Sequence, residues 1–234
     1  MIKRLIFDLD NTLITWEDTY YEFAVKNVCK DLHLANYSEI LNIVITSIDN
    51  YEKNYEYFSI NNMVTLLNKN ANISNYSHIT FDKIFVQKLI YYFTFCIPNK
   101  ADPSVSETLK YLSKKYDLVI LTNWFEEPQI TRLKKLDILQ YFSHVYGTEK
   151  IKNKPNKEAF ITAIGDFKSS ECVMIGDNIN TDIQGALNCN INAIFYNKKN
   201  INLSDNTNIL QQILKQNSNN IKCITSLTEL KEIL

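Results

Sequence analysis

Short, uninterrupted runs of apolar residues recur along the chain, and each of them ends at polar or turn-forming residues. The first run, within Arg4–Phe7, stops directly before the sequence Asp-Leu-Asp-Asn-Thr. Continuous runs of this length are typical of strands that are buried on both faces, as in a parallel sheet. Similar runs occupy residues 118–121, 143–146, 172–175, 193–196 and 221–224. We therefore expect these segments to form one parallel sheet.

Segments with helical character separate most of these strands. Pro128 falls where a helix would begin, and proline is well tolerated in a first turn. Alternation of strands and helices is typical of a parallel sheet covered by helices on both faces. The expected helices span residues 107–115, 128–136, 157–164, 182–187 and 227–234. The pattern predicts an α/β fold with a Rossmann-like parallel sheet core.

Residues 16–97 do not follow this alternation of strands and helices. The segment contains no glycine, has few strand signals, and repeats aromatic and aliphatic residues at helical spacing, as in Phe85 and Leu89. We expect it to form an all-helical domain inserted after the first strand. Residues 1–15 and 98–234 would then form a discontinuous α/β core. The asparagine-rich segments are predicted to be loops: 68–75, 197–208 and 217–220.

Composition excludes several classes of protein. Hydrophobic residues make up 45% of the chain and charged residues 22%, which are ordinary globular values. The formal net charge of −1 lacks the basic excess of a nucleic-acid-binding surface. No apolar stretch approaches the roughly 20 residues that cross a bilayer, and the N-terminal residues do not resemble a signal peptide. We expect a cytoplasmic protein that binds neither nucleic acid nor a membrane.

The cysteines suggest neither a disulfide framework nor a zinc site. Their number is odd, their spacing is wide, and no Cys-x-x-Cys pair occurs. Most lie in apolar runs, where free cysteine acts as a small buried residue. We expect reduced core cysteines, consistent with a reducing cytoplasm, at all five positions: Cys29, Cys96, Cys172, Cys189 and Cys223.

The residues that follow the expected strands are the first candidates for a functional site, because ligands of open parallel sheets bind beyond the carboxyl ends of the strands. These positions carry acids, a hydroxyl, an amide and a lysine: Asp8, Asp10, Thr122, Asn123, Lys154, Asp177 and Asp182. Clustered carboxylates repel unless they share a cation or a proton, and oxygen-only ligands favour a hard ion such as Mg²⁺. A hard cation beside donors for an anion predicts phosphoryl transfer. The alternatives are surface carboxylates, turn formers and a solvated basic loop.

Four short motifs then identify a resemblance. The sequence Asp-Leu-Asp-Asn-Thr-Leu at residues 8–13 resembles the first motif of the haloacid dehalogenase (HAD) superfamily of phosphohydrolases. Residues 121–123, Lys154 with its following proline, and Gly176-Asp177 with Asp182 are similar to the second, third and fourth motifs, in family order. The resemblance covers essentially the whole chain. It is nearest to the branch with pyrimidine nucleotidases and N-acylneuraminate-9-phosphatases, and residues 16–97 stand where the family carries a helical cap domain.

The resemblance implies a role for each acid. Asp8 would attack phosphorus and form an aspartyl-phosphate, while Asp10 would protonate the leaving oxygen and later activate water. The carboxylates of Asp8 and Asp177 and the main-chain carbonyl of Asp10 would bind Mg²⁺. Asp182 would orient the lysine or the metal shell.

The resemblance also implies phosphate-binding residues. Thr122, Asn123 and Lys154 would hold the transferring phosphoryl group and offset its charge. The chain has only 4 glycines, and Gly176 is the one expected to serve the site, because a side chain there would obstruct the close approach of the backbone.

Two positions bear on the branch of the family and on the pocket. Dehalogenases of the superfamily resemble the pattern at Asp8 but lack an acid two residues later, so Asp10 favours phosphate ester hydrolysis. Asn11 and Trp124 depart from the glycines that many members have; asparagine tolerates left-handed backbone geometry. A tryptophan such as Trp124 is more often a core residue than a substrate contact, so we expect core packing, with shaping of the substrate pocket as the alternative.

These observations predict a Mg²⁺-dependent phosphatase that acts on small phosphomonoesters such as nucleoside monophosphates or sugar phosphates. A phosphomutase and a catalytically silent binding module of the same family remain alternatives. The sequence leaves the substrate and the cap residues that select it unassigned. It is compatible with a monomer or a homodimer.

Overall fold

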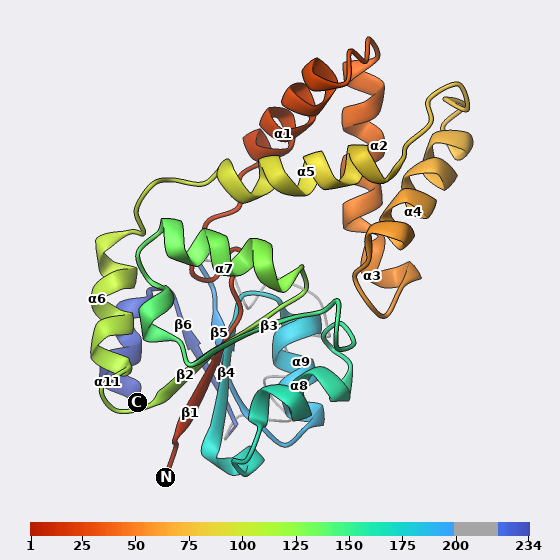
Figure 1. Cartoon of the computed structure of the whole chain (residues 1–234). Helices are drawn as coiled ribbons and strands as arrows, with labels where there is room; N and C mark the ends of the chain where they lie inside the picture. The colour runs from red at the N-terminus through yellow and green to blue at the C-terminus, as the bar shows by residue number, and fades with distance from the viewer. Residues whose placement is uncertain (199–219) are drawn as a thin grey trace.

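The computed structural model of the chain describes residues 1–198 and 220–234. These residues contain one parallel sheet of six strands in the order β3-β2-β1-β4-β5-β6 (Figure 1). All of the expected strands are confirmed, with ends that differ from the predicted ones by a residue or so: β1 Arg4–Phe7, β2 Asp117–Thr122, β3 His144–Gly147, β4 Cys172–Gly176, β5 Asn192–Tyr196 and β6 Ile221–Ile224.

The strand order reverses beside β1. The chain runs outward from β1 through β2 to β3, and β4 then returns to the other side of β1. Phe7 therefore pairs with Ile120 of β2 and with Ile175 of β4. Because all strands are parallel, the residues that follow β1, β2 and β4 emerge side by side at one edge, which is where open α/β sheets bind their ligands.

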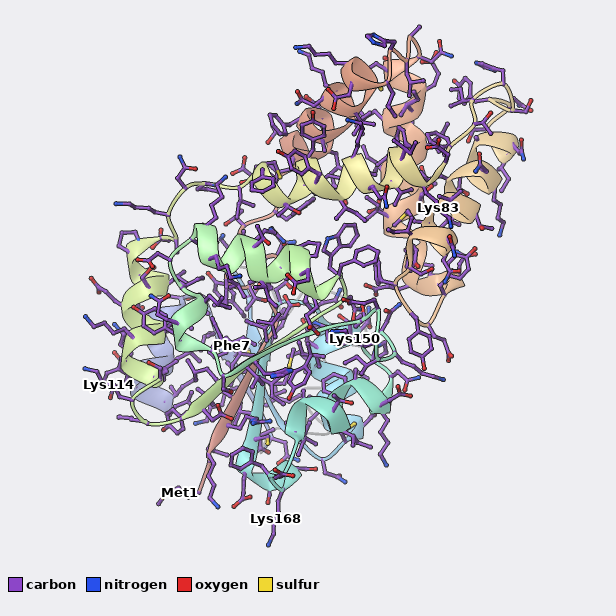
Figure 2. The ribbon with its side chains drawn as sticks, viewed as in Figure 1. Met1, Phe7, Lys83, Lys114, Lys150 and Lys168 are labelled. Atoms are coloured by element: carbon purple, nitrogen blue, oxygen red, sulfur yellow. The ribbon has the colours of Figure 1, made fainter. Side chains whose placement is uncertain are left out.

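The alternation of side chains along each strand divides the core into two layers. Leu5 and Phe7 of β1 face one side of the sheet, while Ile6 faces the other. Figure 2 shows Phe7 inside the molecule, whereas Lys114 and Lys168 point outward. Burial on both faces explains why the strands read as continuous apolar runs.

Helices cover both faces, as predicted. The layer over Leu5 and Phe7 contains α6 (Pro103–Leu112), α7 (Glu126–Lys135) and α11 (Leu230–Ile233). The layer over Ile6 contains α8 (Lys157–Ile164), the π-helical turn η3 (Ile179–Ile183) and α9 (Gln184–Asn188). Single turns of 3₁₀-helix complete the core: η1 Leu139–Tyr141, η2 Ser169–Glu171 and η4 Leu227–Glu229.

Residues 16–97, which lie between β1 and α6, are helical, as expected, and we call them the helical insertion. Its helices are α1 (Asp18–Asp31), α2 (Tyr37–Asp49), α3 (Tyr51–Asn54), α4 (Ile60–Ile73) and α5 (Lys83–Phe95). They enclose a cluster of buried side chains separate from the two clusters on the sheet, with Val28, Tyr51 and Leu67 at its centre. Figure 1 shows the insertion beyond the end of the sheet where β1 and β4 finish.

Two expectations about secondary structure were wrong. Residues 68–73 belong to α4 and are not a loop, because Leu67 and Ala71 are buried at helical spacing. The side chain of Asn68 is used within the fold, since it donates a hydrogen bond to Val64 O and accepts one from Phe81 N. Helix α6 begins at Pro103, several residues earlier than expected, where the Asp102 side chain caps Ser104 N. The loops predicted at 197–208 and 217–220 lie largely outside the described residues.

The cysteines are free, but they are not all core residues. Cys29, Cys172 and Cys189 are buried, Cys96 is half-buried, and Cys223 is exposed. Cys223 differs because β6 is an edge strand whose central residues face solvent. None of the helices among residues 1–198 and 220–234 combines the length and apolar character needed to cross a bilayer.

Candidate active site

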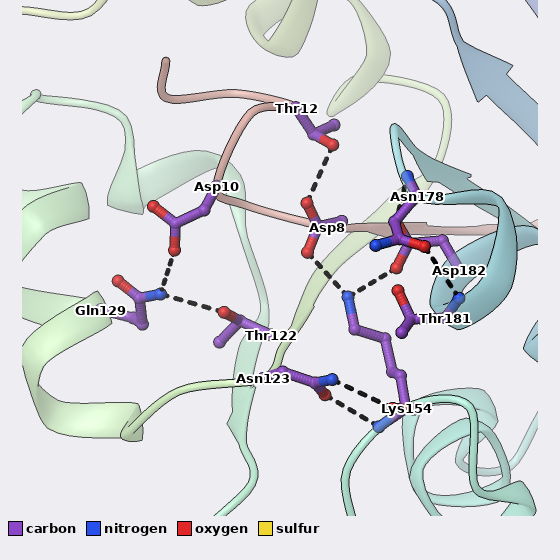
Figure 3. A network of polar contacts seen from close by, with 10 residues as sticks. All are labelled: Asp8, Asp10, Thr12, Thr122, Asn123, Gln129, Lys154, Asn178, Thr181 and Asp182. Carbon is purple, nitrogen blue, oxygen red and sulfur yellow. Dashed lines mark hydrogen bonds and ion pairs between the residues drawn. The ribbon is translucent and has the colours of Figure 1, made fainter. Parts of the chain in front are cut away.

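Asp8 lies at the centre of the polar network at the sheet edge (Figure 3). It follows β1 directly, and its main-chain N–H donates to Ile175 O of β4 at 2.9 Å. One carboxylate oxygen, Oδ2, accepts a hydrogen bond from Thr12 Oγ1 at 2.9 Å, and the other, Oδ1, lies 2.7 Å from Lys154 Nζ. The carboxylate is therefore held in one orientation at a buried position.

Lys154 joins Asp8 to Asp182. Its Nζ lies 2.7 Å from Asp182 Oδ1 as well as from Asp8, and the side chains of Lys154 and Asp182 are only 2% and 1% exposed. Burial lowers the pKa of Lys154, but the charges of Asp182 and Asp8 outweigh it and leave the pKa above its usual range. Lys154 is therefore a fixed ammonium. Asp182 is oriented in turn by Asn178 N, which donates to its Oδ2 at 3.0 Å.

The acids around Asp8 form a group that fits a divalent cation. Carboxylate oxygens of Asp8, Asp177 and Asp182 lie within 4.8 Å of one another. Burial raises the pKa of Asp8, and the nearby charges of Asp182 and Asp177 act in the same direction against that of Lys154. Three carboxylates therefore lie close together near the Lys154 ammonium, and their hard oxygen ligands suit Mg²⁺. Asp8 and Asp177, expected as ligands, are thus brought together, with Asp182 beside them.

Asp10 faces a different set of partners. Its Oδ2 accepts a hydrogen bond from Gln129 Nε2 at 2.9 Å, and its Oδ1 lies 2.7 Å from a guanidinium nitrogen of Arg132. In Figure 3 its carboxylate points away from Asp8 and toward Gln129. The side chain of Asp10 is therefore separate from the carboxylate group around Lys154. The expectation that the main-chain carbonyl of Asp10 binds the metal stays a prediction.

Thr122 and Asn123 have distinct places in the site. Thr122 Oγ1 is buried and accepts a hydrogen bond from Gln129 Nε2 at 2.9 Å, so its own hydroxyl hydrogen is left for an incoming anion. Asn123 Oδ1 accepts from Lys154 N at 2.8 Å, and Asn123 Nδ2 donates to Lys154 O at 3.0 Å. The structure thus gives the Asn123 side chain a different task from the phosphate donor expected from the sequence: it holds the main chain that carries Lys154.

Gln129 and Arg132 are site residues that the sequence reasoning missed. Both lie on α7 and are almost fully buried, at 0% and 2% exposure. They occupy positions i and i+3 of the helix stripe that also buries Leu133. The available signal was the helical spacing that places Gln129 and Arg132 on the same face as Leu133, because polar groups buried on such a face need partners.

The helical insertion contributes Glu52, from α3, to the cavity around Asp8 and Lys154. Glu52 is exposed at the mouth of this cavity, but the surrounding protein desolvates its carboxylate in part and so raises its pKa, while a hydrogen bond from the Asn123 side chain and the charge of Lys154 act in the opposite direction. The loop after α3 fixes this position, since Phe58 N donates to Thr148 O at 2.9 Å and Asn153 N donates to Glu56 O at 2.6 Å. The sequence held no signal for Glu52, because only the docking of α3 brings it there.

Two cavities meet at Asp10. The polar cavity around Asp8 and Lys154 has a volume of about 200 Å³. The second, of about 190 Å³, which we call the aromatic cavity, has aromatic side chains along part of its wall: Trp16, Tyr21, Phe93 and Trp124. Both cavities are lined by Asp10, Asn11 and Asn123. Trp124 therefore shapes a pocket beside the polar site, although it also packs against other aromatic rings of the insertion.

Local backbone requirements explain two further residues of the first and fourth motifs. Asn11 has φ of 63°, the left-handed conformation that asparagine tolerates well. At Gly176 a Cβ atom would stand 2.3 Å from Asp182 Oδ2. Glycine at this position leaves room for the carboxylate that binds Lys154.

Known proteins share this sequence and fold. A family model described as haloacid dehalogenase-like hydrolase matches residues 2–190. The chain is 25% identical to the pyrimidine 5'-nucleotidase PynA of Streptococcus pneumoniae over 83% of its own length and 84% of that protein. It is 31% identical to a glyceraldehyde 3-phosphate phosphatase of Methanothermobacter thermautotrophicus over 56% of this chain and 58% of that one. Human N-acylneuraminate-9-phosphatase is 32% identical over 41% and 40% of the two chains.

Solved structures agree on the fold. A magnesium-bound structure of YfnB from Bacillus subtilis aligns with a TM-score of 0.71 and 20% identity, over 100% of this chain and 98% of that one. A 2-haloacid dehalogenase from Pseudomonas syringae aligns with a TM-score of 0.65 and 19% identity, over 100% and 98%. The fold alone therefore leaves the chemistry open, and the family match rests on residues 2–190, which include every strand end that contributes to the network around Asp8. The chain belongs to the haloacid dehalogenase-like hydrolase family.

Proposed function

We propose that this protein is a Mg²⁺-dependent phosphatase that hydrolyses small phosphomonoesters through an aspartyl-phosphate on Asp8. The observation that carries the proposal is the fixed Asp8 carboxylate, which lies between a hydroxyl and the Lys154 ammonium and beside two further acids. A buried carboxylate in a single orientation is suited to attack phosphorus in line. The names of the curated relatives, which include a nucleotidase and sugar-phosphate phosphatases, support the same class of reaction.

The residues around Asp8 supply charge compensation for the phosphoryl group. The carboxylates of Asp8 and Asp177 and the main-chain carbonyl of Asp10 would hold Mg²⁺, which when bound offsets the negative charge of the phosphoryl oxygens. Lys154 stays protonated beside Asp8 and can contact the same oxygens, while the hydroxyl of Thr122 can donate to them. Asp182 keeps the ammonium of Lys154 in place.

Asp10 completes the reaction as acid and then as base. As the bond between phosphorus and the leaving oxygen breaks, a bond forms from Asp8 to phosphorus and a proton passes from Asp10 to the leaving oxygen. In the second half, Asp10 takes a proton from the water that attacks the aspartyl-phosphate, which releases phosphate and restores Asp8. Asp10 lines both cavities and so lies where the leaving group must sit.

The aromatic cavity supports a leaving group with a flat or apolar face. Phe93 lies between Trp16 and Trp124, with ring centroids 5.3 and 6.2 Å from theirs. Aromatic walls of this kind suit the flat base of a nucleoside, and the polar residues that line the same cavity, Asp10, Asn11, Asn123 and Arg132, can meet the hydroxyl groups of its sugar. Nucleoside monophosphates are therefore the first substrates to test, with sugar phosphates second.

The helical insertion would act as a cap domain over the site. Residues 16–97 have their own buried cluster, and they contribute Glu52 and much of the aromatic wall. Residues 1–15 and 98–234 would form the core domain on which the cap closes. The cytoplasmic location and the monomeric or dimeric state stay predictions.

The decisive test is release of inorganic phosphate from 4-nitrophenyl phosphate and from a panel of phosphomonoesters, with Mg²⁺ and after chelation. We expect Mg²⁺-dependent turnover that Asp8→Asn abolishes, while Asp166→Asn, which alters an exposed acid far from the site, leaves it unchanged. Equal turnover in the wild type and in Asp8→Asn would overturn the proposal. Isomerisation of a sugar phosphate without release of phosphate would instead identify a mutase.

A further inference from the structure

A closed network on α7 holds the side chain of Asp10. Its two carboxylate oxygens are bound by different residues, Oδ1 by Arg132 at 2.7 Å and Oδ2 by Gln129 at 2.9 Å. Arg132 Nη1 in turn donates to Gln129 Oε1 at 2.6 Å. Because both oxygens have fixed partners, rotation of the Asp10 carboxylate is restricted. Oδ1 is buried against Arg132, whereas Oδ2 can accept one hydrogen bond besides the one from Gln129, so Oδ2 is the atom that can carry the proton.

The network is buried on the side of α7 and open on the side of the cavities. Arg132 is 2% exposed and Asp10 is 31% exposed. The guanidinium carbon of Arg132 lies 5.3 Å from the ring centroid of Trp16, which forms one wall of the aromatic cavity. Gln129 also bonds Thr122 Oγ1 at 2.9 Å, and this bond links Asp10 to the phosphate side of the site. The network therefore connects the residues on both sides of the scissile bond.

We propose that Arg132, braced by Gln129, is a positioning residue that aims the Asp10 carboxyl group at the leaving-group oxygen. This inference rests on the proposed phosphatase activity and concerns the step in which Asp10 gives its proton to that oxygen as the bond to phosphorus breaks. The Asp10 carboxylate left by this transfer faces the Arg132 charge, so the network favours the product of proton transfer as well as its geometry. Arg132 itself acts through Asp10.

Leaving-group dependence separates this role from a purely structural one. An alkyl phosphate expels a strongly basic alkoxide and needs the proton, whereas 2,4-dinitrophenyl phosphate expels a stable phenolate and does not. Loss of a positioned general acid costs on the order of 100-fold or more in rate. Arg132→Met should therefore lower kcat for the alkyl ester by about 100-fold while changing kcat for the dinitrophenyl ester by less than about 3-fold.

Arg4 provides a matched control at the opposite end of β1. It also binds an aspartate, with Nη2 2.5 Å from Asp117 Oδ2, and it also packs over an aromatic ring, 4.6 Å from the centroid of Phe167. Arg4→Met should change the rates with both esters by the same factor. Arg132→Lys, which keeps the charge but loses the planar fork, should fall between the wild type and Arg132→Met for the alkyl ester.

The outcomes are distinct. No phosphate release from either ester by the wild type would refute the proposed function itself. An active wild type combined with equal losses for the two esters in Arg132→Met would overturn the positioning role. If Arg132→Met fails to fold, the same comparison is made with Arg132→Lys and with Gln129→Leu, and an unchanged ratio of the two rates in both variants rejects the inference.

Discussion

The ammonium nitrogen of Lys154 lies 2.7 Å from Oδ1 of Asp8, and both groups are buried. This contact joins the loop before α8 to the end of β1, and the same ammonium also binds Asp182. The stability of the site and its chemistry therefore depend on a single cation, and the first prediction tests both.

Lys154→Met should remove activity and destabilise the fold. Without the ammonium, the carboxylates of Asp8 and Asp182 remain buried and face each other, and breaking a buried ion pair from one side costs about 3–5 kcal/mol. Urea denaturation measures the loss. Lys150→Met is the control, because Lys150 is 67% exposed and pairs with Glu126 at the surface, where an ion pair contributes about 0–1 kcal/mol. Similar losses in the two variants would contradict the prediction.

Mg²⁺ should stabilise the protein in the absence of substrate. Binding to the folded state alone adds about 2.7 kcal/mol when the ion is present at 100 times its dissociation constant. Thermal unfolding with increasing Mg²⁺ should show a rising Tm for the wild type. Asp177→Asn should lose most of this rise, whereas Asp166→Asn should keep it. A rise of the same size in Asp177→Asn would exclude Asp177 from the ion site.

Glu52→Gln should change selectivity for charge in the substrate. Glu52 places a carboxylate from the helical insertion beside the phosphate site, so a substrate with a second phosphate or a carboxylate meets repulsion. Removing the charge should raise kcat/KM for a bisphosphate by about 10-fold, or ~1.4 kcal/mol, with little change for an uncharged leaving group.

Glu56→Gln is the matched control for Glu52→Gln. Glu56 lies four residues further along the chain, is 62% exposed, and is paired with Lys152 at 2.8 Å. The Glu56→Gln variant should leave the preference between a bisphosphate and a substrate with an uncharged leaving group unaltered. An identical preference in the wild type and Glu52→Gln would show that this carboxylate does not face the leaving group.

Gly176→Ala should disturb Asp182 first. The added Cβ would stand 2.3 Å from Asp182 Oδ2, so the carboxylate must move away from Lys154. Overpacking of this kind costs about 1–3 kcal/mol, and activity should fall with the loss of stability. In the double variant Gly176→Ala with Asp182→Ala, the contacts with the Asp182 carboxylate group are absent and the contact with the Cβ of residue 182, at 2.7 Å, remains. The loss of stability in the double variant should therefore be smaller than the sum of the losses in the two single variants. Full additivity would place the strain elsewhere.

Much of the fold was predictable because its signals are local. The strands are continuous apolar runs, since both of their faces are buried, and the turn residues after them mark their ends. Local signals were weaker where asparagine is frequent. Residues 68–73 were predicted to form a loop but continue α4, because Leu67 and Ala71 pack inside the insertion. Composition alone does not show that contact.

The candidate site divides in the same way. The sequence by itself determined which acids, hydroxyl and lysine gather at the sheet edge, because parallel strands bring their carboxyl ends to one place. Asp8 and Asp177 each follow a strand directly, and Thr122 is the last residue of β2. Only the tertiary structure decided which side chains orient them. Gln129 and Arg132 reach Asp10 from a helix, Asn123 turns to the main chain of Lys154, and Glu52 arrives from the insertion. These contacts join residues 31 to 122 positions apart or depend on how one helix packs, and no local pattern of residues encodes them.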